Sequence, residues 1–404
     1  MSKEERKVPE LRFKGFHDDW EQRKLGDVAE QLEYGLNASA TEYDGLNKYI
    51  RITDIDDKNR KFDKGAITSP NIELHSSDNY LLREGDILFA RTGASVGKTY
   101  IYDINDGKVY YAGFLIRARI NSNTNSDFIF QNTLTKKYYN FVRITSQRSG
   151  QPGINANEYK NYKISMPQID EQDSISDFLK TLDDLIVLHQ RKIQILDNMY
   201  SLFIREIYPK KHEVVPKMRF SEYSSHWVKI TLESLLKEFS IKSSIENEYQ
   251  ILSSTNSGME FRRGRVSGSS NRGYKIIDNG DLVLSPQNLW LGNININKLG
   301  KGLVSPSYKT FSIDKVDGEF LEPQLRTKRM LNTFENVSTQ GASVVRRNLD
   351  MDLFKQIIVK VPTNQEKEKI ANLLNLIMNL IKHYDSKLMK LQTIKTEYLK
   401  KMFL

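Results

Sequence analysis

The sequence predicts an α+β fold: two mixed α/β domains in a pseudo-twofold tandem repeat, separated by two long antiparallel coiled-coil helices. Three observations lead to this prediction. The chain of 404 residues repeats itself, each copy contains short apolar runs bounded by Gly, Asn and Asp, and each copy ends in a long heptad pattern. At about 100–200 residues per domain, the length accommodates two such domains.

The internal repeat is visible in motifs that recur in the same order. Residues 8–13 (VPELRF) match residues 215–220 (VPKMRF) at an offset of 207 residues. Residues 85–88 (GDIL) match residues 280–283 (GDLV) at an offset of 195 residues. The second copy therefore lacks 12 residues between its opening and its Gly-Asp turn. Several matches in one order, with a single length difference, indicate a duplication.

The repeat divides the chain into four expected segments. These are a first globular domain at residues 8–165, a central spacer helix at 166–210, a second globular domain at 215–360 and a C-terminal spacer helix at 361–404.

Each long helix is predicted from apolar residues that alternate four and three positions apart, the spacing of a coiled-coil seam. The seam comprises Ile175, Leu179, Leu182, Ile186, Ile193 and Leu196 in the first helix, and Ile370, Leu374, Ile377, Ile381, Leu388 and Leu391 in the second. Lys395 interrupts the second seam. A helix cannot bury such a seam alone, so we expect the two helices to pair antiparallel as a spacer. The alternative is that each helix docks only on its own domain.

Positive charge is concentrated in the second half of the chain. The formal net charge is +9, distributed as +1 over residues 1–7, +1 over 8–165, −3 over 166–214, +6 over 215–360 and +4 over 361–404. The second domain contains three basic clusters, at residues 262–265 (RRGR), 326–329 (RTKR) and 346–347 (RR). A single arginine-rich loop is often only a solvated surface, but three in one domain favour a nucleic-acid partner.

Candidate nucleic-acid contacts come from these clusters and from polar turns in both copies. Arginine can pair with guanine, and Gln or Asn with adenine, in the major groove. The candidates are Arg91, Lys98, Arg148 and Gln151 in the first domain, and Arg262, Arg263, Arg265, Arg272, Gln287, Asn288, Arg346 and Arg347 in the second.

The sequence contains no clear catalytic or metal-binding motif. Residues 93–99 (GASVGKT) resemble a phosphate-binding loop, but three residues rather than four separate the glycines, and a strand rather than a helix is predicted to follow. The chain has no cysteine, which excludes disulfides and Cys-ligated metals. Asp86 and Asp281, which follow glycine in the repeated turn, are interpreted as structural. No apolar run reaches the roughly 18 residues of a membrane span, and we expect a cytoplasmic protein.

Two other classes of protein stay open on the residues alone. One is a nuclease or NTPase with a fused coiled coil, which an assay of the isolated chain for hydrolysis would identify. The other is a scaffold protein that does not bind DNA, which a gel shift at low and high salt would separate.

The layout over residues 8–404 resembles the specificity subunit of type I restriction-modification systems. The matching motifs are the openings at residues 8–20 and 215–227, the stretch at residues 85–93 (GDILFARTG) and the helix entry at residues 167–172 (PQIDEQ). The second copy departs from this pattern where residues 286–288 (PQN) replace residues 91–93 (RTG).

The resemblance implies a function and a set of partners. Each globular domain would be a target recognition domain that reads one half of a bipartite asymmetric site in double-stranded DNA, and the helices would fix the gap between the halves. The outer faces of the helices would dock modification (methyltransferase) subunits, and a restriction (translocase and endonuclease) subunit would join them. The chain itself would be non-catalytic and would hold no cofactor, because S-adenosylmethionine, ATP and Mg²⁺ would be bound by those partners.

Overall fold

In the computed structural model, which describes residues 8–262, 270–341 and 346–404, the chain divides into two units that each take part of both long helices. Unit 1 comprises Met1–Arg191 and Asp385–Leu404, and unit 2 comprises Lys192–Tyr384. The sequence-based division treats each long helix as a segment of its own. In the structure, one part of each long helix belongs to unit 1 and the other part to unit 2.

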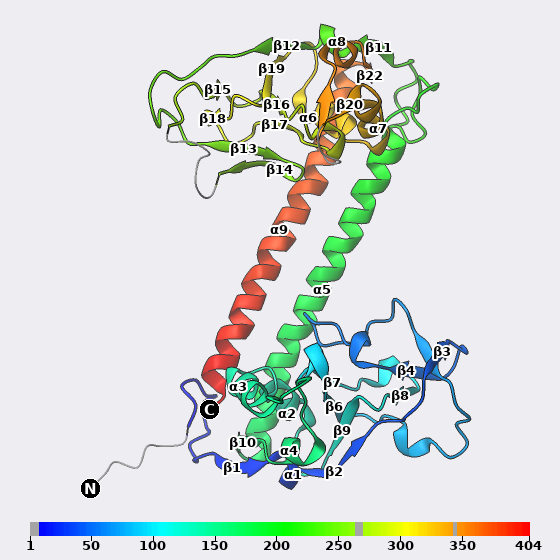
Figure 1. Cartoon of the computed structure of the whole chain (residues 1–404), viewed down its shortest axis with the longest axis vertical. Helices are drawn as coiled ribbons and strands as arrows, with labels where there is room; N and C mark the ends of the chain where they lie inside the picture. The colour runs from blue at the N-terminus through cyan, green and yellow to red at the C-terminus, as the bar shows by residue number, and fades with distance from the viewer. Residues whose placement is uncertain (1–7, 263–269, 342–345) are drawn as a thin grey trace. The chain divides into compact units, whose positions relative to one another are not determined.

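Unit 1 alternates short strands with helices (Figure 1). Its strands are β1 (Glu21–Lys24), β2 (Ala29–Tyr34), β3 (Ala40–Glu42), β4 (Lys48–Ile50), β5 (Thr68–Pro70), β6 (Asp86–Ala90), β7 (Thr99–Ile101), β8 (Val109–Tyr111), β9 (Leu115–Ile120) and β10 (Lys163–Met166). Its helices are α1 (Leu25–Val28), α2 (Ser126–Asn132), α3 (Lys136–Thr145), α4 (Ala156–Lys160) and the first part of α5 (Ile169–Ile207). The side chains of Asn125, Thr135 and Asn155 accept hydrogen bonds from the first turns of α2, α3 and α4, which fixes where these helices begin.

The central sheet of unit 1 has the antiparallel strand order β2-β9-β6-β7. Strand β6 is buried along its whole length. Its alternate side chains enter two cores, since Ile87 and Phe89 pack with the helices whereas Leu88 and Ala90 pack with residues of β4 and β8. Coverage of both faces explains why β6 is a nearly continuous apolar run.

Unit 2 repeats this plan. Its strands are β11 (Val228–Thr231), β12 (Leu236–Phe239), β13 (Leu252–Thr255), β14 (Gly258–Phe261), β15 (Lys275–Ile277), β16 (Leu282–Leu284), β17 (Ile294–Ile296), β18 (Gly302–Val304), β19 (Lys309–Ile313), β20 (Ser338–Gln340), β21 (Arg347–Leu349) and β22 (Ile358–Val361). Its helices are α6 (Gly318–Leu325), α7 (Lys328–Asn336), α8 (Met351–Lys355) and the first part of α9 (Asn364–Met402). The central sheet again has the antiparallel order β12-β19-β16-β17.

The units differ most between the first strand of the central sheet and the Gly-Asp turn, where the second copy is shorter. Unit 1 contains the antiparallel pair β3–β5 and the parallel pair β4–β8, whereas unit 2 contains the hairpin β13–β14 and the antiparallel pair β15–β18. The hairpin is attached to the sheet by buried asparagines. Asn293 Nδ2 donates to Ser254 O at 2.9 Å, and Asn295 Nδ2 donates to Thr255 O at 2.7 Å.

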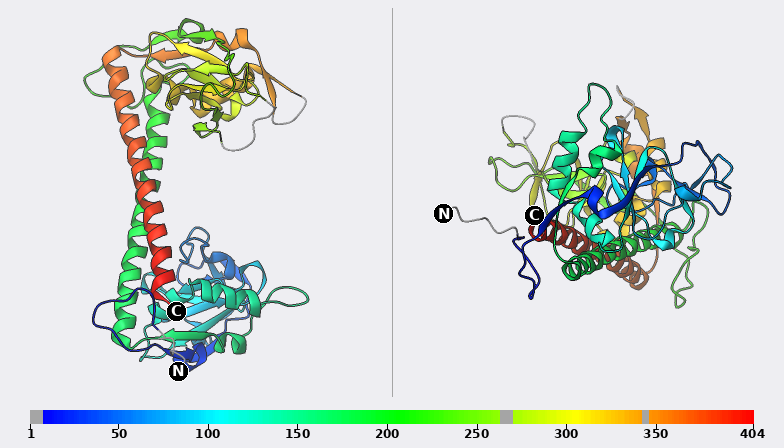
Figure 2. Two further views of the ribbon diagram at one scale, coloured as in Figure 1. Left: turned by 90° about the vertical axis from the view of Figure 1, so that its left-hand side faces the viewer. Right: turned by 90° about the horizontal axis from the view of Figure 1, so that it is seen from below.

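Helices α5 and α9, of 39 residues each, lie side by side and antiparallel within each unit (Figures 1 and 2). In unit 1 the ring centroids of Phe178 and Tyr398 are 4.7 Å apart, and Asp183 pairs with Lys395, so numbers fall along α9 as they rise along α5. The predicted fold class is confirmed. The buried seam residues are Ile175, Leu179, Leu182, Ile186, Ile370, Leu374, Ile377 and Ile381, and the half-buried ones are Ile193, Leu196, Leu388 and Leu391.

Lys395, which interrupts the apolar seam, has a specific partner. Its Nζ lies 2.5 Å from Asp183 Oδ1, and Gln131 Nε2 donates to the other oxygen of Asp183 at 2.8 Å. At the repeat offset the corresponding residues of unit 2 are Tyr200 and Met378. A polar pair at one position of an otherwise apolar seam favours a single register of the two helices.

An ion pair between a half-buried arginine and a buried glutamate anchors the opening of each repeat to the first turn of a long helix. Arg12 donates to Glu171 of α5 through Nε at 2.6 Å and Nη2 at 2.7 Å. Arg219 makes the same two bonds to Glu366 of α9, at 2.7 Å and 2.8 Å. These bonds raise the pKa of both guanidinium groups, so the arginines stay charged. Bidentate geometry of this kind compensates for the burial of two charges.

The repeated Gly-Asp turn is structural, as predicted. Asp86 is buried, accepts the backbone N–H of Arg83 at 2.9 Å and pairs with Arg119 at 2.8 Å. Asp281 accepts the backbone N–H of Asp278 at 2.6 Å. Both carboxylates therefore close the turn that leads into the central sheet.

Replacing Glu366 with alanine should destabilise unit 2 by about 3–5 kcal/mol, because Arg219 would remain buried without its counter-charge. The indole nitrogen of Trp227 lies 3.4 Å from Glu366, and its fluorescence, together with that of Trp20 and Trp290, follows unfolding in urea. The matched control is Glu222→Ala, which breaks the exposed pair with Lys369 and should have a much smaller effect. Equal shifts of the urea midpoint in the two variants would contradict the assignment.

Candidate nucleic-acid interface

Two loops beside the central sheet of unit 1 are joined by backbone hydrogen bonds. Gly93 N donates to Pro152 O at 2.9 Å, and Ile154 N donates to Arg91 O at 2.8 Å. Gly93 has φ +71°, and a Cβ atom there would lie 2.8 Å from Gln151 Nε2. The chain thus brings the predicted residues Arg91 and Gln151 to neighbouring positions.

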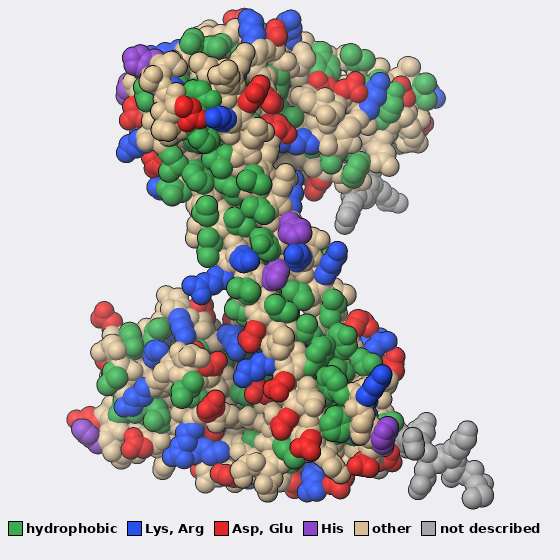
Figure 3. Space-filling model, turned by 180° about the vertical axis from the view of Figure 1, so that it is seen from behind, with side chains coloured by type: hydrophobic (Ala, Val, Ile, Leu, Met, Phe, Trp, Pro, Cys, Tyr) green, Lys and Arg blue, Asp and Glu red, His purple; other side chains and the backbone are tan. Residues whose placement is uncertain are grey.

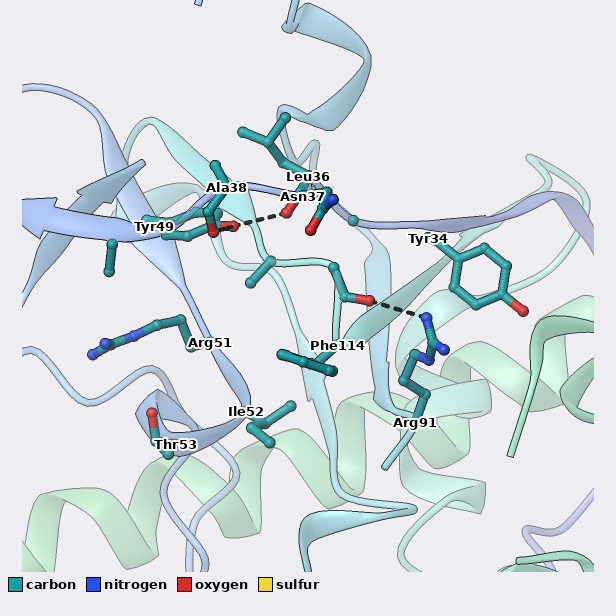
Figure 4. Close-up of a pocket in the computed structure, with 14 residues that line it drawn as sticks. Tyr34, Leu36, Asn37, Ala38, Tyr49, Arg51, Ile52, Thr53, Arg91 and Phe114 are labelled. Atoms are coloured by element: carbon teal, nitrogen blue, oxygen red, sulfur yellow. Dashed lines mark hydrogen bonds between the residues drawn. The ribbon is translucent and has the colours of Figure 1, made fainter. Parts of the chain in front are cut away.

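Arg91 lies at the edge of a pocket of about 600 Å³. Its guanidinium carbon is 4.7 Å from the ring centroid of Tyr34, and its Nη1 donates to Gly113 O at 3.4 Å. Figure 4 shows Arg91 and Tyr34 on one side of the pocket, Arg51 on the other and Phe114 between the two arginines in this view. The aromatic and carbonyl contacts hold the Arg91 side chain in one orientation.

Two arginines line this pocket, and one of them is already paired with a carboxylate beside it. Its lining contains Arg51 and Arg91 but no carboxylate. Arg51 donates to Asp54 through Nε and Nη2, both at 2.9 Å, and these bonds raise the pKa of the guanidinium group above its ordinary value. No sequence motif points to Arg51, whereas an aromatic residue after glycine in a short turn is a signal for Phe114.

A second pocket of unit 1, of about 620 Å³, has the opposite charge. It lies at the entry to α5 and is lined by Asp18, Asp19, Glu21 and Asp27, with Arg23 as its single basic residue. Because four carboxylates repel phosphate groups, the Arg91 pocket is the better candidate surface for a nucleic acid.

Two of the residues predicted to contact nucleic acid in unit 1 are instead bonded to other groups of the protein. Lys98 is buried, its Nζ pairs with Asp57 at 2.5 Å and it donates to Ile55 O at 3.1 Å. Arg148 pairs with Glu158 and donates through Nη1 to two backbone carbonyls at 2.9 Å. Lys98 in particular is not presented at the surface.

The segment Gly93–Ser95 is a single 3-10 turn followed by strand β7, in agreement with the exclusion of a phosphate-binding loop.

Unit 2 joins the corresponding loops in the same way. Arg347 N donates to Gln287 O at 3.2 Å, which places Gln287 and Asn288 next to the β20–β21 hairpin. Gln287 and Arg346 are exposed. Arg347 instead donates to Ser338 Oγ and Ser338 O, each at 2.9 Å, and holds the hairpin together.

The basic clusters of unit 2 are only partly available at the surface. Arg272 is exposed and Arg262 is half-buried at the end of β14, while Arg263 and Arg265 lie outside the described residues. The cluster at residues 326–329 points partly inward, contrary to expectation. Arg326 Nη1 donates to Asn295 Oδ1 at 2.6 Å, and burial lowers the pKa of Arg329, whose Nη1 contacts Pro209 O.

No group of three or more His, Asp or Glu side chains is arranged to hold a metal ion within the residues that the structure describes. Over the same residues, no helix combines the length and the apolar character needed to cross a bilayer.

Comparison with known proteins identifies similar sequences. Residues 17–198 match the model of the type I restriction modification DNA specificity domain. The putative type I restriction enzyme MjaX specificity subunit of Methanocaldococcus jannaschii is 24% identical over 386 residues, which cover 90% of this chain and 88% of that protein. The type I restriction enzyme MjaVIII specificity subunit of the same organism is 22% identical over 279 residues, or 62% of this chain and 59% of that protein.

Two solved structures share the fold. The crystal structure of the type I restriction-modification S subunit from M. genitalium superposes with a TM-score of 0.64 at 15% identity, over 98% of this chain and 99% of that one. A chain from a structure on complex assembly and conformational transition of the type I R-M system gives a TM-score of 0.51 at 13% identity, over 96% of this chain and 98% of that one.

Replacing Arg262 and Arg272 together by alanine should weaken binding to duplex DNA, because fewer phosphate charges are neutralised. Fluorescence-anisotropy titrations at several salt concentrations should show the slope of log K against log salt falling by about 1 for each phosphate that is no longer neutralised. Arg205→Ala, which removes an exposed arginine from α5, is the control and should leave affinity and slope unchanged. Unaltered binding by the double variant would exclude these two arginines from the interface.

Proposed function

This chain belongs to the type I restriction-modification specificity-subunit family, and we propose that it selects the DNA sequence at which such a complex acts. The observation that carries the proposal is a duplicated frame with different side chains on corresponding loops. Unit 1 presents Gln151 there, whereas unit 2 presents Gln287 and Arg346. Different donors and acceptors on one frame are what the reading of two different base sequences requires.

In this proposal each unit reads one half of a bipartite site. The site is asymmetric because the two units differ both in their loop residues and in the strands between the sheet and the Gly-Asp turn.

Helices α5 and α9 set the unread gap between the two halves. Each helix has 39 residues and is therefore about 58 Å long at ~1.5 Å per residue. Both helices contribute to both units, so a change in their common length changes the spacing of the half-sites.

The outer faces of the helices bind modification (methyltransferase) subunits. In unit 2, α5 exposes Ile195, Met199 and Leu202, and α9 exposes Leu376 and Leu380. The steps of four and three residues on α5 form a second apolar stripe besides the seam. Figure 3 shows hydrophobic side chains gathered on the surface of the helices. An exposed stripe of this spacing is typical of a helix that packs against helices of another protein.

The chain itself catalyses no reaction in this proposal. The modification subunits bind S-adenosylmethionine and methylate adenine, and a restriction subunit binds ATP and Mg²⁺ for translocation and cleavage. Membership of the specificity-subunit family and the DNA specificity domain at residues 17–198 support this division of tasks.

Inserting one heptad at matched positions of both helices should lengthen the unread gap by about three base pairs, since seven residues add ~10.5 Å. Mapping methylated adenines in the host genome, with and without the gene, measures both the target and its gap. Insertion into α5 alone is the control and should destroy the seam register. Methylation at the original gap after matched insertion would contradict the role of the helices, and the absence of any gene-dependent motif would contradict the proposed function.

Changing Leu376 and Leu380 to glutamate should weaken the association with modification subunits at least tenfold, because two charges would be buried in an apolar contact. Co-purification and titration with the modification subunit measure this loss. Ile241→Glu is a matched control, since Ile241 is 60% exposed in unit 2 but lies outside the helices. Normal assembly of the double variant would place the docking surface elsewhere.

A further inference from the structure

Phe114 is a strongly exposed aromatic residue at the mouth of the Arg91 pocket. Its side chain is 60% exposed, and it lies in the tight turn that connects β8 to β9. Leu115 N closes this turn by donating to Ala112 O at 2.8 Å. The backbone therefore holds Phe114 in a defined position at the surface.

The fold does not require an aromatic residue at this position. The pairing of the strands shows which residue of unit 2 corresponds to Phe114. Ile87 pairs with Ala118 in unit 1, and its repeat counterpart Leu282 pairs with Phe311 in unit 2, so Ala118 corresponds to Phe311. The same register relates Phe114 to Ser307, in a turn that Tyr308 N closes by donating to Ser305 O at 3.1 Å. The same turn thus carries a small polar residue in one unit and an exposed aromatic residue in the other.

The surroundings of Phe114 are basic. Among the 14 residues that line the pocket, the charged side chains are Arg51 and Arg91, and in the view of Figure 4 Phe114 lies between them. Both guanidinium groups are oriented, Arg51 by Asp54 and Arg91 by Tyr34 and Gly113. In duplex DNA the edges of the bases lie between two phosphate backbones. An apolar ring between two oriented cations has the corresponding arrangement, with the ring facing a base edge and the cations facing phosphates.

We propose that Phe114 contacts the C5-methyl group of a thymine in the half-site read by unit 1, while Arg51 and Arg91 contact phosphates; this rests on the proposed function. The thymine methyl is the one apolar group that a base pair presents in the major groove, and apolar side chains recognise it. Phe114 is therefore a specificity-determining residue of unit 1, and Ser307 makes no such contact in unit 2.

The test replaces each thymine of the unit 1 half-site in turn with deoxyuracil, which removes only the C5-methyl group. Binding is measured with the complete complex of this chain and its modification subunits. For the wild type, one substitution should lower the affinity roughly fourfold, the factor expected for one buried methyl group. For Phe114→Ala, the affinities for thymine and deoxyuracil at that position should be equal. Deoxyuracil in the other half-site should affect both proteins alike.

Further variants separate a base contact from a phosphate contact. Arg51→Ala and Arg91→Ala should each lower the salt slope by about 1, whereas Phe114→Ala should leave the slope unchanged. Ile104→Ala, which shortens a 65% exposed side chain outside the pocket, should change neither the deoxyuracil response nor the slope. An identical deoxyuracil response of the wild type and Phe114→Ala at every thymine would overturn the inference. Loss of all sequence preference in the wild-type complex would instead overturn the proposed function.

Discussion

The apolar seam along α5 and α9 is the constraint on which the rest of the structure depends, because neither helix can keep that seam from water alone. Each unit therefore includes a part of both helices, and distant segments of the chain meet at them. Leu11 N donates to Lys401 O at 2.9 Å in unit 1, and Met218 N donates to Glu206 O at 3.0 Å in unit 2. In both units the opening segment of the repeat is therefore hydrogen-bonded to the last turns of one long helix. An Arg–Glu pair joins the same segment to the first turn of the other long helix.

On this frame the common and the variable parts of the repeat are separated in space. The central sheet, its Gly-Asp turn and the Arg–Glu pair recur in both units. The loops beside the sheet recur in backbone position but differ in side chains, and the strands between β2 and β6 of unit 1 have a different pairing from those between β12 and β16 of unit 2. Under the proposed function this separation has a use, since the frame can be preserved while the residues that contact the two half-sites change.

Local charge proves more informative than net charge. Residues 8–165 carry a net charge of only +1, yet unit 1 contains one pocket with two arginines and no carboxylate, and another pocket with four carboxylates. A sum over the domain averages these surfaces and conceals both. In unit 2 the net charge overstates the positive charge available at the surface, because some of the arginines form hydrogen bonds within the protein. Arg326 and Arg347 hold loops in place through hydrogen bonds to neighbouring side chains and carbonyls.

The sequence by itself determined the duplication, the antiparallel helix pair and the structural role of Asp86 and Asp281, because each of these rests on local spacing or on a turn that a few residues specify. The tertiary structure alone decided which polar residues reach the surface. Lys98 is bound to Asp57, and Lys395 is bound to Asp183, 212 residues away in the chain. It also assembled the Arg51–Phe114–Arg91 surface from three separate loops. Whether a charged side chain is free to bind a ligand depends on partners that only the folded chain brings within hydrogen-bond distance, and no local pattern records them.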